Sequence, residues 1–313
     1  MVAKIRREKQ RSYCKAQAKS QLSVTIKVTN KKARFVLAFL CLSFTEPSYT
    51  KRMTKYAACI EYDGTDYCGW QRLKDSPSVQ EEVEKALSSV ANHSVELTCA
   101  GRTDSGVHGI GQIVHFESDA TRDEKAWRMG CNTNLPDNIV LRWIQPIDDS
   151  FHARFSAKSR CYRYIILNHQ IRPAILDKKV CWYRDKLDET CMQQAASKLL
   201  GENDFTSFRA AGCQAKHAMR ELLEITVSRE GHFIYVDIVA NAFLHHMVRN
   251  IVGSLFEVGD GRRDSKWFDE LLNAKDRTQA GITAPACGLY FVSVEYPVEF
   301  DLPENAEPPF FGF

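Results

Sequence analysis

Residues 95–117 read Val-Glu-Leu-Thr-Cys-Ala-Gly-Arg-Thr-Asp-Ser-Gly-Val-His-Gly-Ile-Gly-Gln-Ile-Val-His-Phe-Glu, and they carry the most informative pattern of the chain. Two runs typical of β-strands, 95–99 and 111–117, flank a glycine-rich connection that contains Asp104. Glycines permit backbone angles closed to other residues and let a ligand approach the main chain closely. Arg102 offers a cation two positions from the acid, which favours the ionised carboxylate. The stretch predicts a catalytic loop between two strands, although Asp and Gly are also common in ordinary turns.

Strand and helix patterns alternate on both sides of this loop. In the first half we expect strands at 56–62 and 139–145, a helix that begins after Pro77-Ser78, and a short helix at 124–131. Ser78 and Glu81 have the spacing of a capping box at the start of the first helix.

The second half repeats the alternation loosely. We expect a helix at 188–200 and a long helix with a wide apolar face, for which Asn241 is the predicted N-cap and Gly259 the predicted stop. The expected strands of this half are 161–167, 220–229, 232–240 and 289–296. This order predicts the α+β class, with mixed or antiparallel sheets and helices on one face, divided near residue 150.

The resulting domain organisation has four parts. Residues 51–150 form an N-terminal α+β domain with the Asp104 loop, and residues 151–300 form a C-terminal α+β domain. Residues 301–313 are an extended tail. Residues 1–50 show no sustained periodicity and are interpreted as an extension outside the fold. A targeting peptide and a native start at Met53 are the two alternatives for them.

Composition excludes several classes of protein. The chain has 313 residues, 44% of them apolar, which is enough for a sizeable core. Its one long apolar stretch, 35–44, is too short to span a bilayer, so we expect no membrane association. The eleven cysteines include no Cys-x-x-Cys pair and fit reduced thiols in the cytosol. The sequence contains no glycine-rich phosphate loop, which argues against kinases, dehydrogenases and any nucleotide cofactor.

Metal chemistry is the obvious rival interpretation, because His245 and His246 are adjacent. We expect neighbouring histidines at the start of a helix to point to different faces, and the sequence has no His-Glu-x-x-His pattern. The prediction is therefore that no metal is used.

Charge is distributed unevenly along the chain. Residues 1–50 hold eleven Lys and Arg against two acids, which leaves 31 basic against 37 acidic residues in 51–313. Within this acidic body, residues 151–184 carry eight cations and only Asp177 as an acid. A basic segment on an acidic body is the expected footprint of a polyanionic partner.

The segment Arg154–Tyr164 interleaves cations with aromatic rings, in the order Arg-Phe-Ser-Ala-Lys-Ser-Arg-Cys-Tyr-Arg-Tyr. This composition suits phosphate contacts beside a surface on which bases stack, so nucleic acid is the predicted ligand. An edge strand with solvated cations and buried tyrosines explains the segment equally well.

Taken together, the motifs resemble those of the tRNA pseudouridine synthase A (TruA) family from Tyr56 to about Leu302. The segments that carry the resemblance are Glu61-Tyr62-Asp63-Gly64, Gly69-Trp70-Gln71, Gly101-Arg102-Thr103-Asp104, Gly106-Val107-His108, Phe151 to Ser156, Tyr162-Arg163-Tyr164, Asn203 to Phe208, His245 to Asn250, and Gly288-Leu289-Tyr290. Ser105 departs from the family's usual alanine, and residues 1–50 have no counterpart in it.

The resemblance implies a fold and an activity. It implies two similar domains with helices on their outer faces and an active-site cleft between them. It also implies a cytoplasmic homodimer that isomerises uridine to pseudouridine at positions 38, 39 and 40 of the tRNA anticodon stem-loop, with no cofactor.

The resemblance further implies residue roles. Asp104 is the expected catalytic carboxylate, which attacks C1′ or accepts a proton in a glycal route. Tyr162 stacks on the flipped base and Arg249 forms an ion pair with Asp104. Arg102 holds the displaced stem or a phosphate, and Arg160 contributes to binding.

Two functions of other classes compete with this expectation. One is a non-catalytic protein that binds structured RNA, and the other is a metal-dependent hydrolase of RNA phosphate esters. The sequence leaves open which tRNAs are preferred and how two subunits divide their contacts with one tRNA.

Overall fold

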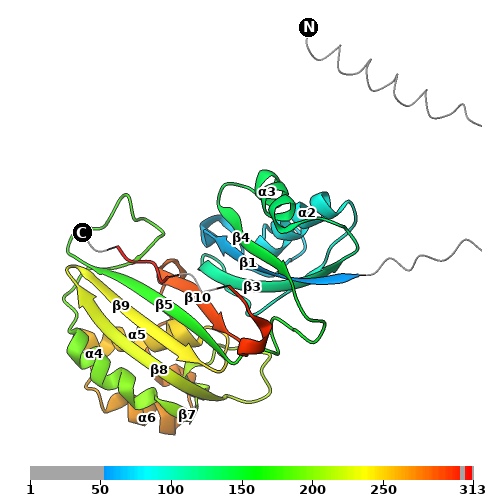
Figure 1. Ribbon diagram of the computed structural model, residues 1–313. Helices are drawn as coiled ribbons and strands as arrows, with labels where there is room; N and C mark the ends of the chain where they lie inside the picture. Colours follow the sequence, from blue (N-terminus) through cyan, green and yellow to red (C-terminus); the bar gives the residue numbers. More distant parts are fainter. Residues whose placement is uncertain (1–52, 304–306, 312–313) are drawn as a thin grey trace, which may run out of the picture. The chain divides into compact units, whose positions relative to one another are not determined.

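Ten strands of the computed structural model form one mixed sheet, within the described residues 53–303 and 307–311 (Figure 1). The strand order is β4-β1-β3-β10-β5-β9-β8-β7, with β2 paired to β3 and β6 paired to β5. Neighbouring strands are antiparallel except for the β3–β10 and β5–β6 pairs. The strands are β1 (Thr54–Tyr62), β2 (Leu97–Cys99), β3 (His108–Ser118), β4 (Ile139–Pro146), β5 (Ser159–Asn168), β6 (Cys181–Tyr183), β7 (Gly201–Asp204), β8 (Met219–Glu230), β9 (Phe233–Ala240) and β10 (Leu289–Glu295).

Helices cover opposite faces of the sheet in its two halves. The described α-helices are α2 (Val79–Ala91), α3 (Glu124–Asn134), α4 (Glu189–Ala196), α5 (Met247–Gly259) and α6 (Trp267–Ala274). Helices α2 and α3 pack with β1, β3 and β4 in one apolar cluster. Helices α4, α5 and α6 pack with β5, β8 and β9 in another, which also holds the side chains of β1 that point away from α2. Since side chains alternate along a strand, the two helix layers lie on opposite faces, and the predicted α+β class is confirmed.

Strand β10 joins the two halves of the chain. It runs parallel to β3, with Tyr290 beside His108 and Phe291 beside Gly109, and antiparallel to β5 on its other side. The predicted division near residue 150 falls between β4 and β5, and both halves contribute strands to the shared sheet. That the halves are separate domains stays a prediction.

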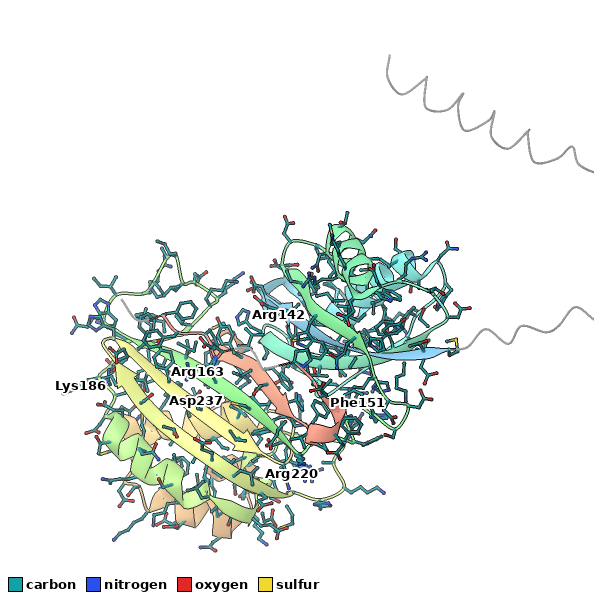
Figure 2. All side chains as sticks on the ribbon, in the orientation of Figure 1. Arg142, Phe151, Arg163, Lys186, Arg220 and Asp237 are labelled. Atoms are coloured by element: carbon teal, nitrogen blue, oxygen red, sulfur yellow. The ribbon has the colours of Figure 1, made fainter. Side chains whose placement is uncertain are left out.

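The face of the sheet opposite α5 is covered by the end of the chain. Arg163 on β5 donates two hydrogen bonds to Asp237 on β9, both 2.7 Å long (Figure 2), and a third to the carbonyl of Pro309. The ring of Phe310 stacks on Tyr235 with centroids 5.5 Å apart. Residues 307–311 therefore pack on the sheet, as an extended tail does.

Several local predictions were wrong. Ser78 precedes α2, but its hydroxyl makes no capping bond and lies buried without a partner. Helix α5 begins at Met247 and has His246, with φ of 59°, as its N-cap, so Asn241 is not the cap. The sequence patterns also missed β6, β7 and α6, which are short.

Two expectations concern membranes and the N-terminus. In residues 53–303 and 307–311, no helix combines the length and apolar character that crossing a bilayer requires. The expectation for residues 1–50 lies outside the described residues.

Candidate active site

The loop that carries Asp104 is fixed from both sides by neighbouring segments. The Tyr62 hydroxyl bonds the Thr103 hydroxyl at 2.8 Å, and the amide of Trp70 donates to the Thr103 carbonyl. On the other side, the Gln112 side chain donates to the Gly101 carbonyl at 2.6 Å and accepts from the Gly101 amide at 3.3 Å. The loop therefore presents its carboxylate from a fixed backbone, as a preorganised site requires.

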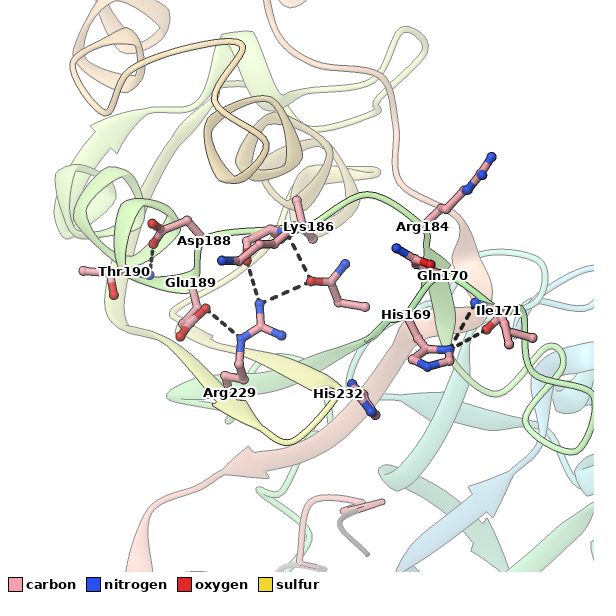
Figure 3. A pocket seen from close by; sticks show the side chains of 12 residues that line it. His169, Gln170, Ile171, Arg184, Lys186, Asp188, Glu189, Thr190, Arg229 and His232 are labelled. Carbon is pink, nitrogen blue, oxygen red and sulfur yellow. Dashed lines mark hydrogen bonds and ion pairs between the residues drawn. The ribbon is translucent and has the colours of Figure 1, made fainter.

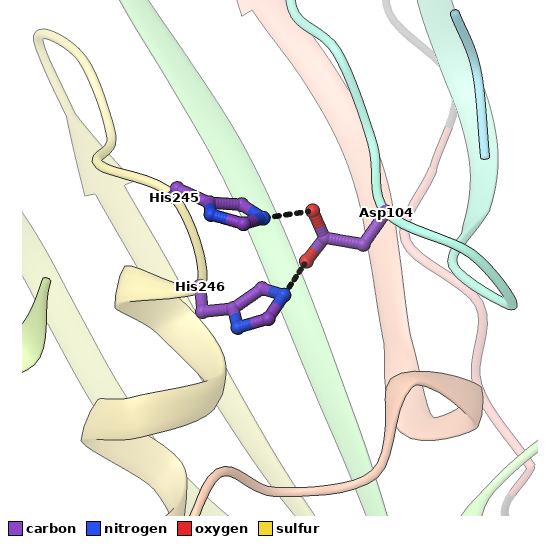
Figure 4. Close-up of side chains that lie close together, drawn as sticks. All are labelled: Asp104, His245 and His246. Carbon is purple, nitrogen blue, oxygen red and sulfur yellow. Dashed lines mark ion pairs between the residues drawn. The ribbon is translucent and has the colours of Figure 1, made fainter. Parts of the chain in front are cut away.

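Three side chains from the start of α5 converge on this carboxylate. Arg249 Nη1 lies 3.1 Å from Asp104 Oδ2, and His246 Nε2 lies 3.3 Å from the same oxygen. His245 Nε2 lies 3.5 Å from Oδ1, on the other side of the carboxylate (Figure 4). The Asp104 side chain is 25% exposed, so it is accessible to a ligand but partly shielded from water. An Asp from the first half of the chain and a cationic helix end from the second half thus meet in one cluster.

Arg249 is held by a second contact that aims its guanidinium. Its Nε donates to the Ala284 carbonyl at 2.8 Å, while the Ala284 amide donates to the Arg249 carbonyl at 3.0 Å. The loop that contains Ala284 packs on α5 so closely that a Cβ on Gly253 would lie 1.7 Å from the Ile282 carbonyl oxygen. The ion pair therefore depends on the close fit between α5 and this loop.

Tyr162 lies on β5, on the same face of the sheet as α5. Its ring is 8% exposed and meets Phe243 and Phe291 edge-on, at centroid distances of 4.9 and 5.0 Å. Burial raises the pKa of Tyr162 well above its ordinary value, and the nearby Asp104 charge acts in the same direction. The hydroxyl therefore stays protonated. It lies next to the Asp104 loop, since a Cβ added at Gly101 would be 3.9 Å from the hydroxyl oxygen.

The two other predicted site residues, Arg102 and Arg160, have different surroundings in the structure. Arg102 is exposed, and none of the described residues makes a hydrogen bond or ion pair with its side chain. Arg160 is largely enclosed and donates to four backbone carbonyls, those of Ala157, Asn241, Ala100 and Arg154, at 3.2, 2.8, 3.3 and 2.6 Å. Its substrate contact stays a prediction, while its hydrogen bonds tie the Asp104 loop to two other loops.

The expectation that His245 and His246 diverge was wrong. Both residues precede the helix, and the left-handed backbone of His246 brings the two rings to a centroid distance of 4.0 Å. Their Nε2 atoms and the Asp104 carboxylate could therefore hold a metal ion. Burial lowers the pKa of His246, partly opposed by the charge of Asp104, so this imidazole is neutral near pH 7. The absence of a metal requirement stays a prediction. The only sign in the sequence that both histidines belong to the site was their place in the same motif as Arg249, His245 to Asn250.

A cavity of about 740 Å³ lies apart from this cluster, near the start of α4 (Figure 3). Its lining includes His169, His232, Arg184 and Lys186, and the Arg229–Glu189 ion pair at 2.7 Å crosses it. None of its lining residues contacts Asp104. The cavity and the Asp104 cluster are therefore separate features of the molecule.

The cluster combines a partly exposed carboxylate, one fixed guanidinium and a buried tyrosine ring, which suits attack on, or charge stabilisation at, a carbon next to a planar base. A family model described as tRNA pseudouridine synthase matches residues 58–156 and 195–297. The chain belongs to the tRNA pseudouridine synthase family. Members of this family isomerise uridine to pseudouridine in tRNA, and the chain is accordingly an isomerase with tRNA as its substrate.

Relatives of high similarity carry the name tRNA pseudouridine synthase A. The protein of Vibrio vulnificus (strain YJ016) is 57% identical over 257 residues, which cover 82% of this chain and 97% of the relative. The protein of Hydrogenovibrio crunogenus is 58% identical over 251 residues, or 80% of this chain and 96% of the relative. That of Enterobacter sp. (strain 638) is 56% identical over 261 residues, or 83% and 97%. The family predicted from the motifs is therefore confirmed.

Proposed function

We propose that this chain acts on uridines 38, 39 and 40 of the tRNA anticodon stem-loop, with the Asp104 carboxylate as nucleophile. The observation that carries the proposal is the 3.1 Å contact between Asp104 and Arg249, which come from opposite halves of the chain. The buried ring of Tyr162 beside them supports it. The choice of uridines 38, 39 and 40 rests on the resemblance of the sequence motifs to those of the tRNA pseudouridine synthase A family.

In the proposed reaction, Asp104 attacks C1′ of the nucleotide and the N1–C1′ bond breaks with its electron pair on uracil N1. The retained uracil rotates, C5 bonds to C1′ and the carboxylate leaves. C5 loses its proton and N1 gains one, so the product is an isomer and no other reactant is consumed. In the glycal alternative, the same carboxylate accepts a proton from the sugar. Both routes need the Asp104 carboxylate next to the sugar, and the contact with the Arg249 guanidinium at 3.1 Å holds it in place.

A uridine in a stem must leave its stack before it can reach Asp104, and this costs a few kcal/mol. We propose that Tyr162 stacks on the extruded base and that the exposed Arg102 holds the displaced strand or a phosphate. Arg160 adds positive charge near the site, while its hydrogen bonds hold the surrounding loops. The acting form is proposed to be a homodimer in the cytoplasm. Sedimentation velocity of the purified protein should give twice the mass of one chain, and a monomer at micromolar concentration would contradict the dimer.

The decisive experiment uses tRNA with tritium at uridine C5. With excess EDTA present, we expect tritium release by the native chain and none by Asp104→Asn or Asp104→Ala. Both variants should bind tRNA nearly as well as the native chain, because affinity rests on many phosphate contacts. Asp137→Asn is the matched control, since Asp137 is an exposed acid far along the chain, in the turn before β4.

Each competing function has its own outcome in this assay. Tritium release by Asp104→Asn at the native rate would overturn the role of Asp104. Binding without release by the native chain would favour a non-catalytic binder, and strand scission that EDTA abolishes would favour a hydrolase. Product mapped to positions other than 38–40 would overturn the proposed target while leaving the isomerase intact.

A further inference from the structure

Phe155 is a large apolar side chain that the fold leaves in solvent. It lies on the connection between β4 and β5, and 76% of its surface is exposed. Burying a phenylalanine side chain contributes about 1.5–3 kcal/mol to a fold, and this chain forgoes most of that contribution here. Single exposed apolar residues are common, so the surroundings of the ring decide whether it has a role.

The surroundings hold the ring in one orientation. Phe155 lies against the His152 imidazole, with centroids 4.3 Å apart and planes tilted by 31°. The amides of Arg154 and Phe155 both donate to His152 Nδ1, at 3.2 and 3.3 Å, and the Ser156 hydroxyl accepts from the His152 amide. His115 continues the row, 4.7 Å from His152. One face of the Phe155 ring is thus supported by the His152 imidazole, and the exposed ring belongs to a preorganised aromatic group.

Hydrogen bonds of Arg160 place this ring beside the catalytic loop. One terminal nitrogen, Nη2, donates both to the Arg154 carbonyl at 2.6 Å and to the Ala100 carbonyl at 3.3 Å. Ala100 directly precedes Gly101 of the Asp104 loop. Burial raises the pKa of the Cys99 thiol, and the charges of Arg102 and Arg154 both oppose that shift, so both exposed guanidinium groups lie within electrostatic range of Cys99. The aromatic group therefore lies at the edge of the active site.

The charge next to the ring suits a nucleotide. The Arg154 guanidinium lies 5.7 Å from the centroid of the Phe155 ring. Arg154 and Lys158 are exposed, and within the described part of the chain no acid is paired with either. A flat apolar ring with a guanidinium over it matches a base with its phosphate, because every base has a stacking face and every phosphate a negative charge.

We propose that Phe155 is a stacking platform for an unpaired base of the tRNA other than the reacting uridine, with Arg154 contacting the phosphate next to that base. The reacting uridine is assigned to the space beside Asp104 and Tyr162, so the platform holds a second base that leaves the stack when the target is extruded. The inference rests on the proposed tRNA reaction at Asp104 and adds a second contact point to it.

The test measures tRNA binding by four variants made in the catalytically silent Asp104→Asn background, so that chemistry does not affect the reading. Loss of the stacking partner in Phe155→Ala should weaken binding by about 5- to 100-fold. Phe155→Leu should be weakened comparably, because leucine restores apolar bulk without a flat ring. Phe155→Trp should bind at least as tightly as the parent, and the fluorescence of the introduced indole should be quenched when tRNA is added. The matched control is Met129→Ala, which removes an exposed apolar side chain from α3 on the other face of the sheet.

Three results would overturn the platform. They are native affinity in Phe155→Ala, native affinity in Phe155→Leu, and a change of sedimentation coefficient in Phe155→Ala, which would assign the ring to a contact between copies of the chain. Urea unfolding of each variant checks that the fold is intact. Failure of the Asp104 reaction would appear as release by Asp104→Asn, and it is therefore distinguishable from failure of the platform.

Discussion

The Asp104 carboxylate receives one permanent cation and two imidazoles from a five-residue segment, 245–249. Burial keeps the pKa of His246 low, so Arg249 is the cation that accompanies the acid at neutral pH. A charged His246 would place a second positive charge beside the same carboxylate oxygen. The number of cations next to Asp104 therefore depends on the partial burial of His246.

Two variants of Tyr162 separate the contribution of its ring to tRNA binding from the contribution of its hydroxyl to turnover. We expect Tyr162→Phe to bind tRNA like the native chain, because the phenylalanine ring keeps the contacts with Phe243 and Phe291. Tyr162→Leu removes the stacking face and should weaken tRNA binding by about 5- to 100-fold. Filter binding measures affinity, and tritium release under saturation measures turnover. A loss of turnover in Tyr162→Phe at unchanged affinity would assign a chemical role to the hydroxyl, and equal affinities of the two variants would contradict stacking.

Arg160 should affect stability more than salt dependence. Its four terminal N–H groups all donate to backbone carbonyls. The single ammonium group of a lysine cannot make the same four hydrogen bonds. Each partly buried carbonyl left without a donor costs about 1–3 kcal/mol, so Arg160→Lys should lower the free energy of unfolding by at least about that amount. Urea denaturation measures the change. The control is the reverse exchange of cations at an exposed position, Lys158→Arg, which should leave the midpoint unchanged. If Arg160→Lys unfolds at the same urea midpoint as the native chain and its tRNA binding depends less on salt, then Arg160 contacts a phosphate directly.

At the scale of elements, the fit between α5 and the loop 281–285 sets the aim of Arg249. Gly253 lies under the Ile282 carbonyl, and the Ala284 backbone exchanges hydrogen bonds with Arg249. A methyl group at Gly253 must displace the loop, since its Cβ would lie 1.7 Å from the carbonyl oxygen. Gly253→Ala should therefore lower turnover by about 10- to 100-fold, the effect of losing one charge-assisted hydrogen bond, while tRNA affinity changes little.

Single-turnover tritium release and filter binding measure the two quantities in this variant. Gly212→Ala is the control, because a Cβ at Gly212 meets no atom within 4 Å, although its φ of 77° adds backbone strain of its own. Turnover of Gly253→Ala equal to that of the native chain would show that the aim of Arg249 does not depend on this loop.

The elements also show what sequence patterns can and cannot predict. The apolar stripe of α5 and the strands on each side of Asp104 follow from local periodicity, and both were predicted. The start of α5 was predicted wrongly because the left-handed turn at His246 has no local signature in a histidine. The same turn brings both imidazoles to Asp104. The four carbonyls that Arg160 binds come from loops up to 81 residues away, so no local pattern contains them.

At the scale of the whole molecule, β10 brings the two halves together. It comes from the last part of the chain and pairs with β3 directly beside the Asp104 loop. Such a pairing between distant segments is set by the total packing of the sheet and not by either strand alone. The motifs nevertheless identified the family, because they are read along the chain and do not depend on knowing this pairing.

Stability of the whole fold should fall in mild acid, because four histidines are packed in neutral form. Burial lowers the pKa of His108, His115, His152 and His246, for His115 from 6.5 to about 4. Since the unfolded chain then binds more protons than the folded chain below pH 6.5, the free energy of unfolding must decrease as the pH falls from about 6.5 toward 4.

Asp63 acts in a separate pH range. Burial alone would raise its pKa, but Lys179 and Thr65 hold the pKa at about 2. Its contribution to stability is therefore lost only below its unfolded value of 3.8.

Urea denaturation at pH 8, 7, 6.5, 5.5 and 4.5 tests this. We expect the midpoint to be constant between pH 8 and 7 as far as these groups are concerned, and to drop steadily below pH 6.5. His115→Gln should reduce the drop, since a glutamine oxygen can accept the Ala153 amide bond now received by His115 Nδ1 without gaining a proton. An unfolding midpoint that rises toward pH 5, or a drop that His115→Gln leaves unchanged, would mean that these imidazoles are already charged in the fold, and the neutral packing of His115 against His152 would have to be abandoned.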